Sequence, residues 1–215
     1  MREYSLGHIS KDVRVVLDQN QVNEPLVGIG DIETLALDDI IKSKVEEAVR
    51  RVHQEAPATL LDGAYNFGES LYWGEDGAGW VLLPDDFMRL VAFQMSDWSR
   101  PVYNPIGLDT PKYAMQSSRF GGVRGTAQKP VCAIAPYAEG KALEFYSCKS
   151  EDAEVKRATY LPNPMLRVED DEQYIEICEK CYRSVVYMVG ALVATAYSEA
   201  DKSNLLTGLS KGALI

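Results

Sequence analysis

Two of the four cysteines have the spacing of metal ligands. Cys178-Glu-Lys-Cys181 places two thiols three residues apart, and Cys132 and Cys148 lie in two segments that we expect to pair as a hairpin. Four thiolates can bind a structural zinc ion. However, no second pair has this spacing, and Cys178 and Cys181 fall on the apolar stripe of a predicted helix. We therefore favour buried thiols and keep a thiol–zinc protein as an alternative.

A second motif has the residue types of a catalytic nucleophile. Gly208-Leu-Ser-Lys-Gly212 matches the pattern around the serine of serine hydrolases. In those enzymes a strand precedes the serine and the histidine follows it, whereas here both histidines, His8 and His53, lie upstream. No carboxylate pair or metal cluster stands out elsewhere. The sequence therefore predicts a protein that is not an enzyme and needs no cofactor or metal.

The composition narrows the class of protein further. The 215 residues are enough for one domain with a full core. A net charge of −10 disfavours tight binding of nucleic acid, because phosphate contacts need clustered Lys and Arg. No apolar run approaches the roughly 20 residues that cross a bilayer, and the first residues do not resemble a signal peptide. We expect a globular protein that is made in a cytoplasm and has no membrane partner.

The segment Phe87–Met95 is predicted to be the central strand, around which the other elements pack. It follows the turn Pro84-Asp85-Asp86 and has apolar side chains on both faces, so both faces should be covered. A helix is predicted at residues 38–55, because apolar residues recur on one side and Asp38 and Asp39 suit its N-terminus.

The remaining elements complete an expected α+β fold. Its small, mostly antiparallel β-sheet packs against a bundle of long helices, with extended loops and terminal arms. The pattern predicts a short strand or extended arm at residues 13–17, a turn-rich aromatic connector at 60–79, a Pro/Gly loop at 98–126, hairpin strands at 130–136 and 142–148, a long helix at 170–197 and a short last helix.

One domain should cover residues 1–215. We divide it into an N-terminal arm (1–36), a helix and sheet core (37–197) and a C-terminal docking segment (198–215). The docking segment holds a dense apolar set that needs a partner surface, either on the chain's own core or on another protein. This set is Leu205, Leu206, Leu209, Leu214 and Ile215.

The order of short motifs resembles the head-to-tail adaptor proteins of tailed bacteriophages, the connector or tail-tubular ring family. The motifs are Leu83-Pro84-Asp85-Asp86-Phe87-Met88-Arg89-Leu90, then Pro101-Val102, Leu143-Glu-Phe-Tyr146, and the long C-terminal helix with Tyr182, Tyr187, Ala191, Leu192 and Ala194. The overlap covers residues 37–209. The crAss-like gut phages are a candidate source.

The resemblance implies a structural virion protein of the neck, assembled in the host bacterial cytoplasm. About twelve copies would form a ring between the portal and a downstream tail or second ring protein. The ring would seal the connector and let genomic DNA pass without sequence-specific binding, and an acidic lumen would suit that passage. The resemblance favours the portal as the partner of the C-terminal docking segment.

Two further expectations stay open at this point. Arg119 and Arg124 in the Pro/Gly loop are candidate partner-binding residues, the alternative being solvated loop charges. A second class of function is a non-enzymatic module that binds a small ligand or a protein, with the aromatic connector as its pocket.

Overall fold

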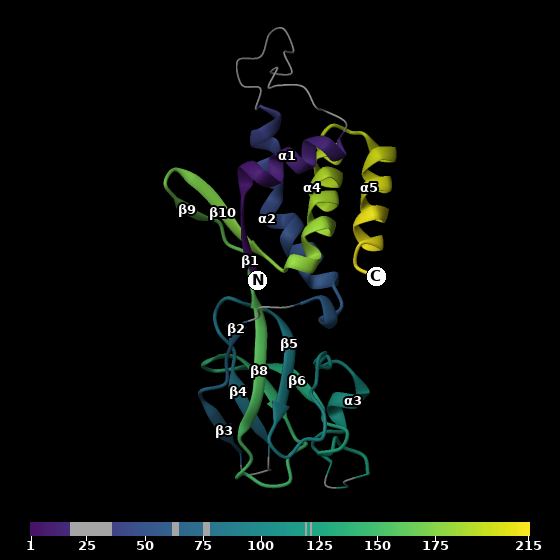
Figure 1. The fold of residues 1–215 in the computed structure, drawn as a ribbon. Coiled ribbons are helices and arrows are strands. Elements are labelled where there is room, and N and C mark those ends of the chain that lie inside the picture. Colours follow the sequence, from purple (N-terminus) through teal and green to yellow (C-terminus); the bar gives the residue numbers. More distant parts are fainter. Residues whose placement is uncertain (18–35, 62–64, 75–77, 119, 121) are drawn as a thin grey trace. The chain divides into compact units, whose positions relative to one another are not determined.

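The computed structural model describes residues 1–17, 36–61, 65–74, 78–118, 120 and 122–215. Contacts within the chain divide it into two compact units (Figure 1). Met1–Gly63 and Pro164–Ile215 form the first, which we call the helical unit, and Ala64–Asn163 form the second, the β unit. The chain thus builds part of the helical unit, then the whole β unit, and then returns to the helical unit.

The expected small sheet on a bundle of long helices is wrong. The described residues form ten strands in three antiparallel sheets, and only four of the five α-helices have seven or more residues. Strands therefore outnumber long helices. The expectation failed because several segments with ambiguous patterns are strands whose partners lie far away in the sequence.

The helical unit is built around α4 (Tyr182–Ala196), which contacts α1 (Leu6–Val16), α2 (Leu37–Glu55) and α5 (Ala200–Gly212). Most α4 side chains are buried, because three helices cover it. A small sheet of order β1-β10-β9 adjoins these helices, with β1 at Arg2–Ser5, β10 at Glu172–Ile177 and β9 at Arg167–Glu169. Two 3-10 turns, η1 (Ala58–Leu60) and η2 (Glu179–Cys181), complete the unit.

The two predictions for the first part of the chain had different outcomes. The helix expected at 38–55 is confirmed as α2, which buries Ile41, Val45 and Val49. The strand or arm expected at residues 13–17 is wrong, because residues 13–16 are the end of α1 and Leu17 lies in the turn after it. Apolar residues at helical spacing from Leu6 onward pack inward, and the Ser5 hydroxyl caps the helix by accepting the His8 N–H at 3.2 Å.

The long helix expected at residues 170–197 is also wrong before Tyr182. Residues of β10 pair with β1 on one side and β9 on the other. Ile175 and Ile177 are buried, as the alternation of a strand requires, and the helix begins only at Tyr182. The acidic residues that suggested a helix N-terminus form the turn of the β9–β10 hairpin instead.

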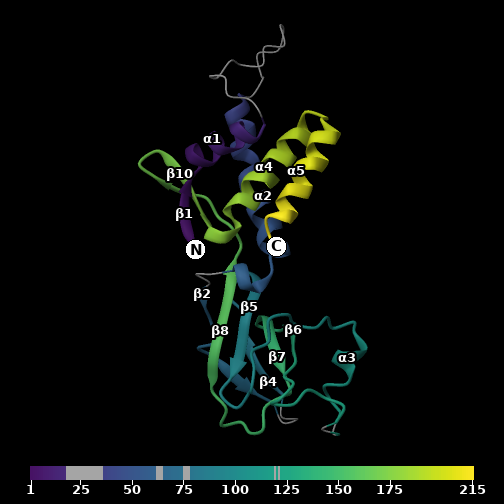
Figure 2. The same cartoon turned by 45° about the vertical axis from the view of Figure 1, so that its right-hand side comes forward.

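The β unit contains two sheets (Figure 2). One has the order β2-β8-β5, with β2 at Tyr65–Asn66, β8 at Val155–Pro162 and β5 at Phe87–Met95. The other has the order β3-β4-β7-β6, with β3 at Leu71–Trp73, β4 at Gly79–Leu82, β7 at Gly140–Phe145 and β6 at Cys132–Tyr137. A short helix, α3 (Pro111–Ala114), lies in the long connection before β6.

The strand and hairpin predictions in this unit are confirmed in part. β5 has the expected bounds, and Leu90, Val91, Ala92 and Phe93 on its two faces are all buried. It is not the middle strand, however, because β8 lies between β2 and β5. The expected hairpin is β6–β7, with Cys132 opposite Phe145 and Tyr137 opposite Gly140.

An aromatic core holds the β unit together. Phe145 is fully buried, and its ring lies 5.4 to 5.7 Å from those of Phe93, Trp98 and Trp73. Such tilted and edge-to-face contacts add to the burial of large apolar area. Gly79 on β4 has no side chain because a Cβ there would overlap the Phe145 ring. Phe145 is therefore a central side chain of this core.

Candidate interaction surfaces

The C-terminal docking segment is partly fixed within the helical unit. Ser184 on α4 and Ser210 on α5 are fully buried, and each hydroxyl donates to the other residue's carbonyl oxygen at 2.9 Å. Leu206 packs where α4 has Gly190, since a Cβ on that glycine would lie 3.2 Å from the leucine Cδ1. α5 is therefore an integral helix of this unit and not a free arm.

The five apolar residues of this segment divide into two groups. Leu206 and Leu214 are buried in the helical unit. Leu205 and Leu209, one turn apart on α5, are 63% and 44% exposed, and Ile215 is fully exposed. Nothing lies within 4 Å of a Cβ built on Gly208 or Gly212, so another surface can approach the helix backbone beside these leucines. We call Leu205, Leu209 and Ile215 the α5 ridge.

The serine pair gives a stability prediction. We expect Ser210→Ala to lower the free energy of unfolding by about 1 kcal/mol, because it removes the buried hydroxyl that donates to the Ser184 carbonyl oxygen. Ser184 still donates to the backbone carbonyl of residue 210, so the double variant S184A/S210A, which removes both bonds, should lose more than Ser210→Ala. Urea unfolding of the wild type and the two variants measures this. A double variant as stable as Ser210→Ala would contradict a contribution from the Ser184 bond.

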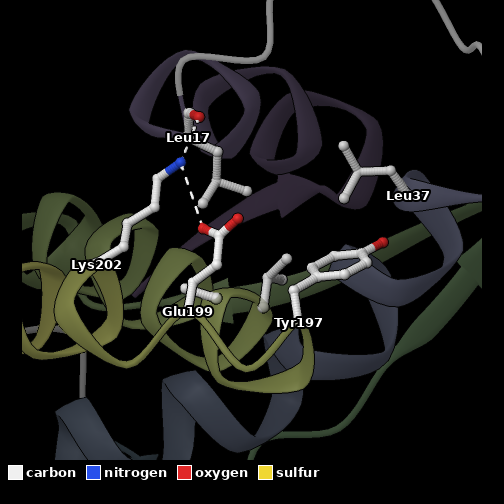
Figure 3. A pocket seen from close by; sticks show the side chains of 7 residues that line it. Leu17, Leu37, Tyr197, Glu199 and Lys202 are labelled. Atoms are coloured by element: carbon white, nitrogen blue, oxygen red, sulfur yellow. Dashed lines mark hydrogen bonds and ion pairs between the residues drawn. The ribbon is translucent and has the colours of Figure 1, made fainter. Parts of the chain in front are cut away.

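A small pocket lies next to the turn between α4 and α5 (Figure 3). Apolar side chains line it, and Lys202 and Glu199 stand at its edge, with the lysine Nζ donating to the Leu17 carbonyl at 2.9 Å and lying 3.7 Å from the glutamate. Its volume is about 90 Å³, well below the ~300 Å³ of a typical small-molecule site. It can take one side chain rather than a cofactor.

Two of the four aromatic rings of the connector, those of Phe67 and Trp73, are packed in the core, whereas Tyr65 and Tyr72 are each 40% exposed. Phe67 contacts the rings of Phe87, Phe93 and Tyr160, and Trp73 meets Phe145 edge-on. These rings are therefore part of the β-unit core, although the sequence suggested a ligand pocket. Tyr160 also donates its hydroxyl to Asp86 at 2.9 Å, and burial together with that carboxylate raises its pKa to about 12.

The long connection before β6 is held in place by side chains. Tyr113 on α3 donates to the carboxylate of Glu144, a buried residue of β7, at 3.2 Å. Burial and the charge of this carboxylate raise the pKa of Tyr113. The Gln116 amide oxygen accepts the Gly125 N–H at 2.9 Å. This part of the connection therefore has a defined shape although it has little regular secondary structure.

The two candidate arginines lie on this connection. Arg124 is partly exposed and pairs with no carboxylate in the described chain, whereas Arg119 lies outside the described residues. Large apolar side chains are exposed around Arg124, with exposed fractions of 47% for Met115, 70% for Phe120 and 48% for Val123. The role of Arg119 and Arg124 in binding a partner stays a prediction.

The cysteines do not converge on a metal site among the described residues, where no group of three or more metal-ligating side chains lies together. Cys178 and Cys181 are buried before α4 and at its N-cap, so the predicted mid-helix position is wrong. The Cys178 N–H donates to His53 Nε2 at 3.2 Å. In the β unit, burial and the Asp97 carboxylate raise the pKa of Cys148 to about 12, and burial also raises the pKa of Cys132.

The burial of Cys178 and Cys181 gives a second stability prediction. We expect C178A/C181A to cost about 1 to 3 kcal/mol through lost packing, with no change in bound metal. Metal analysis of the purified protein and of this variant, each next to its unfolding curve, is the measurement. Stoichiometric zinc that the double substitution removes would overturn the assignment as buried structural thiols.

The β9–β10 hairpin is a surface feature that the sequence patterns do not predict, because its acidic turn falls in the helix expected at residues 170–197. The alternation around Ile175 and Ile177 is the signal for a strand. No family model matches this sequence, and no curated protein matches it.

No helix of the described chain has the length and apolar character needed to cross a membrane. The candidate surfaces are therefore the α5 ridge, the connection around Arg124 and this hairpin.

Proposed function

We propose that this protein is a head-to-tail adaptor of a tailed bacteriophage. In this proposal about twelve copies form a ring that joins the portal to the tail and encloses the channel for the genome. The observation that carries the proposal is the ordered set of motifs from Leu83-Pro84-Asp85-Asp86-Phe87 to the Tyr and Ala pattern of α4. The protein is a structural component of the virion neck in this account and has no catalytic role.

The exposed apolar side chains support the proposal. Monomeric proteins rarely expose contiguous large apolar groups without a partner. Here Leu205 and Leu209 stand exposed on a well-ordered helix beside the open backbone of Gly208. A neighbouring protein would remove the two leucines from water at little entropic cost, because α5 is already packed on α4.

The net charge supports passage of DNA rather than its capture. A formal charge of −10 repels phosphates, and repetition around a ring multiplies this effect. The portal is the partner that we assign to the α5 ridge, and a tail or second ring protein is assigned to the opposite side of the ring. Mixing the protein with the portal of the same phage and measuring the mass of the complex tests the proposal.

The other two candidate functions have less support. Phe67 and Trp73 of the aromatic connector are packed in the core. The apolar pocket of the helical unit is small, and a hollow of about 370 Å³ beside the connector, lined by residues that include Asn66, Gly68 and Ser70, is open to solvent. The thiol–zinc protein would need a set of ligands that the described residues do not bring together. Neither has an observation that favours it over the adaptor.

A further inference from the structure

Charges of opposite sign are segregated along this sequence. Residues 110–138 contain Lys112, Arg119, Arg124 and Lys129 but no Asp or Glu. Residues 169–179 contain only acidic charges, which are Glu169, Asp170, Asp171, Glu172, Glu176 and Glu179. Most proteins intersperse the two signs on their surface. Two segments of pure and opposite charge can instead specify which surfaces meet.

The acidic hairpin tip keeps its charges at a cost in local stability. Asp170 and Asp171 form the two-residue turn with φ of 47° and 62°, a left-handed conformation that Asn-Gly adopts with less strain. Glu169 lies directly opposite Glu172 in the β9–β10 register, where like charges repel. A turn without these charges would make the hairpin more stable. We therefore expect the four carboxylates to have a role other than forming the hairpin.

No cation within the described chain neutralises this tip. Glu169, Asp170 and Asp171 have no ion pair there, and Glu172 accepts only the Tyr174 hydroxyl, at 3.0 Å. This hydrogen bond, together with burial and the nearby carboxylates, raises the pKa of Tyr174. Beside the tip, Val168 is 66% exposed on the edge strand β9. The tip is therefore an unpaired acidic surface with an apolar border.

The connection before β6 has positive charges and exposed apolar side chains, which match the charge and the apolar border of the tip. Its described cations, Lys112, Arg124 and Lys129, pair with no carboxylate of the described chain. Exposed Met115, Phe120 and Val123 accompany them. We call these six residues the basic lobe. A surface for duplex DNA would need cations and polar groups but not three large apolar side chains, so the lobe suits an acidic and apolar protein surface better.

We infer that the acidic β9–β10 hairpin of one copy docks on the basic lobe of a second copy. This inference rests on the proposed ring, because a closed ring needs a head-to-tail contact between two different surfaces of the same chain. The carboxylates of the tip meet Lys112 and Lys129, and Val168 meets the apolar side chains of the lobe. The contact sets the lateral order of the ring and leaves the α5 ridge for the portal.

Exchanging the charges tests this contact. In variant one, E169K/D170N/D171G/E172K changes the charge of the hairpin tip from −4 to +2, and in variant two, K112E/K129E changes the charge of the lobe from +3 to −1. Each variant alone then has like charges on both surfaces, whereas a one-to-one mixture offers two attractive contacts between unlike chains. A carbodiimide joins adjacent carboxylates and lysines covalently, and isotope-labelled and unlabelled chains distinguish cross-links between copies from those within one copy.

We expect wild-type chains to form cross-links between copies that join the hairpin to the lobe. Neither variant alone has carboxylates on one surface and lysines on the other, so the hairpin-to-lobe cross-links are lost in each for chemical reasons. Their recovery in the mixture, where both reactive groups are present on opposed surfaces, is the result that tests the contact. Both variants change exposed residues, and thermal unfolding close to that of the wild type checks that they fold. D170N/D171G is a control that relaxes the turn and removes two of the four tip carboxylates while keeping Glu169 and Glu172, so its hairpin-to-lobe cross-links should fall only in part.

Three results would overturn the inference. Cross-links confined to single chains, with no recovery in the mixture, would place the contact within one copy. Absence of hairpin-to-lobe cross-links in the wild type would remove the contact. Duplex DNA binding that K112E/K129E abolishes, without cross-links between copies, would make the lobe a DNA surface. A portal complex that still forms in any of these cases would leave the adaptor proposal intact, so the two failures are distinguishable.

Discussion

L205S/L209S is expected to abolish the joining of this protein to the portal while leaving its fold intact. Both leucines are exposed on α5, so the substitutions should change the free energy of unfolding by no more than about 0.5 kcal/mol. In the complex each leucine is buried, and losing two such side chains costs about 3 to 6 kcal/mol per subunit. Because the ring repeats this loss, assembly should fail completely. Native mass spectrometry of portal mixtures measures it.

Leu206→Ala is the matched control for the exposed pair. Leu206 is 4% exposed and packs on α4, so its truncation should lower stability by about 2 to 4 kcal/mol. Any Leu206→Ala protein that remains folded should still join the portal, because the α5 ridge is unchanged. If L205S/L209S assembles with unchanged affinity, the α5 ridge is not the docking surface.

Phe145→Ala is expected to have the largest effect on stability. Its ring is fully buried against three other aromatic rings, and removing it leaves a cavity at the centre of the β-unit core. Such a truncation costs about 3 to 5 kcal/mol, a large share of the stability of a domain. Hydrogen exchange followed by mass spectrometry should show faster exchange in β4, β5 and β7.

The same measurement reports how the two units are coupled. We expect α2 and α4 to keep their protection in Phe145→Ala, because the helical unit has its own core around α4. An equal loss of protection in both units would instead support the single domain that the chain length suggests. No loss in β4, β5 or β7 would contradict the central role of this ring.

Local patterns were enough to predict several elements. The stripe of α2 and the apolar stretch of β5 each identify their element without any partner, because burial on one or both faces shows directly in the residue types. The β6–β7 hairpin is equally local, since its strands are joined by a tight turn. Two of these elements, β5 and β7, carry parts of the motifs on which the proposed adaptor function rests.

The elements that were missed depend on distant partners. β10 is a strand because it pairs with β1 at the opposite end of the chain, where Arg2 lies opposite Ile177. The spacing of Tyr174, Cys178 and Cys181 also fits a helix, and only the pairing decides between the two structures. β8 was missed for the same reason, since its charged first half becomes a strand against β5.

The candidate surfaces were predictable in composition but not in detail. The C-terminal segment is visibly rich in apolar residues, yet only the packing of α5 on α4 separates exposed Leu205 from buried Leu206. Neighbouring residues on a helix point in different directions, so the orientation of the helix decides which of them a partner can reach. The acidic tip depends on the β9–β10 hairpin, whose turn places Asp170 and Asp171 between two paired strands. Composition alone does not show this turn.

The mass of the complex with the portal tests the central claim most directly. Purified protein is mixed with portal rings from the same phage and analysed by native mass spectrometry, with negative-stain images of the same sample. The account predicts a defined complex with about one adaptor chain per portal subunit, seen as an added ring on one face of the portal. Portal rings that keep their own mass at saturating protein concentration, with no added ring in the images, would contradict it.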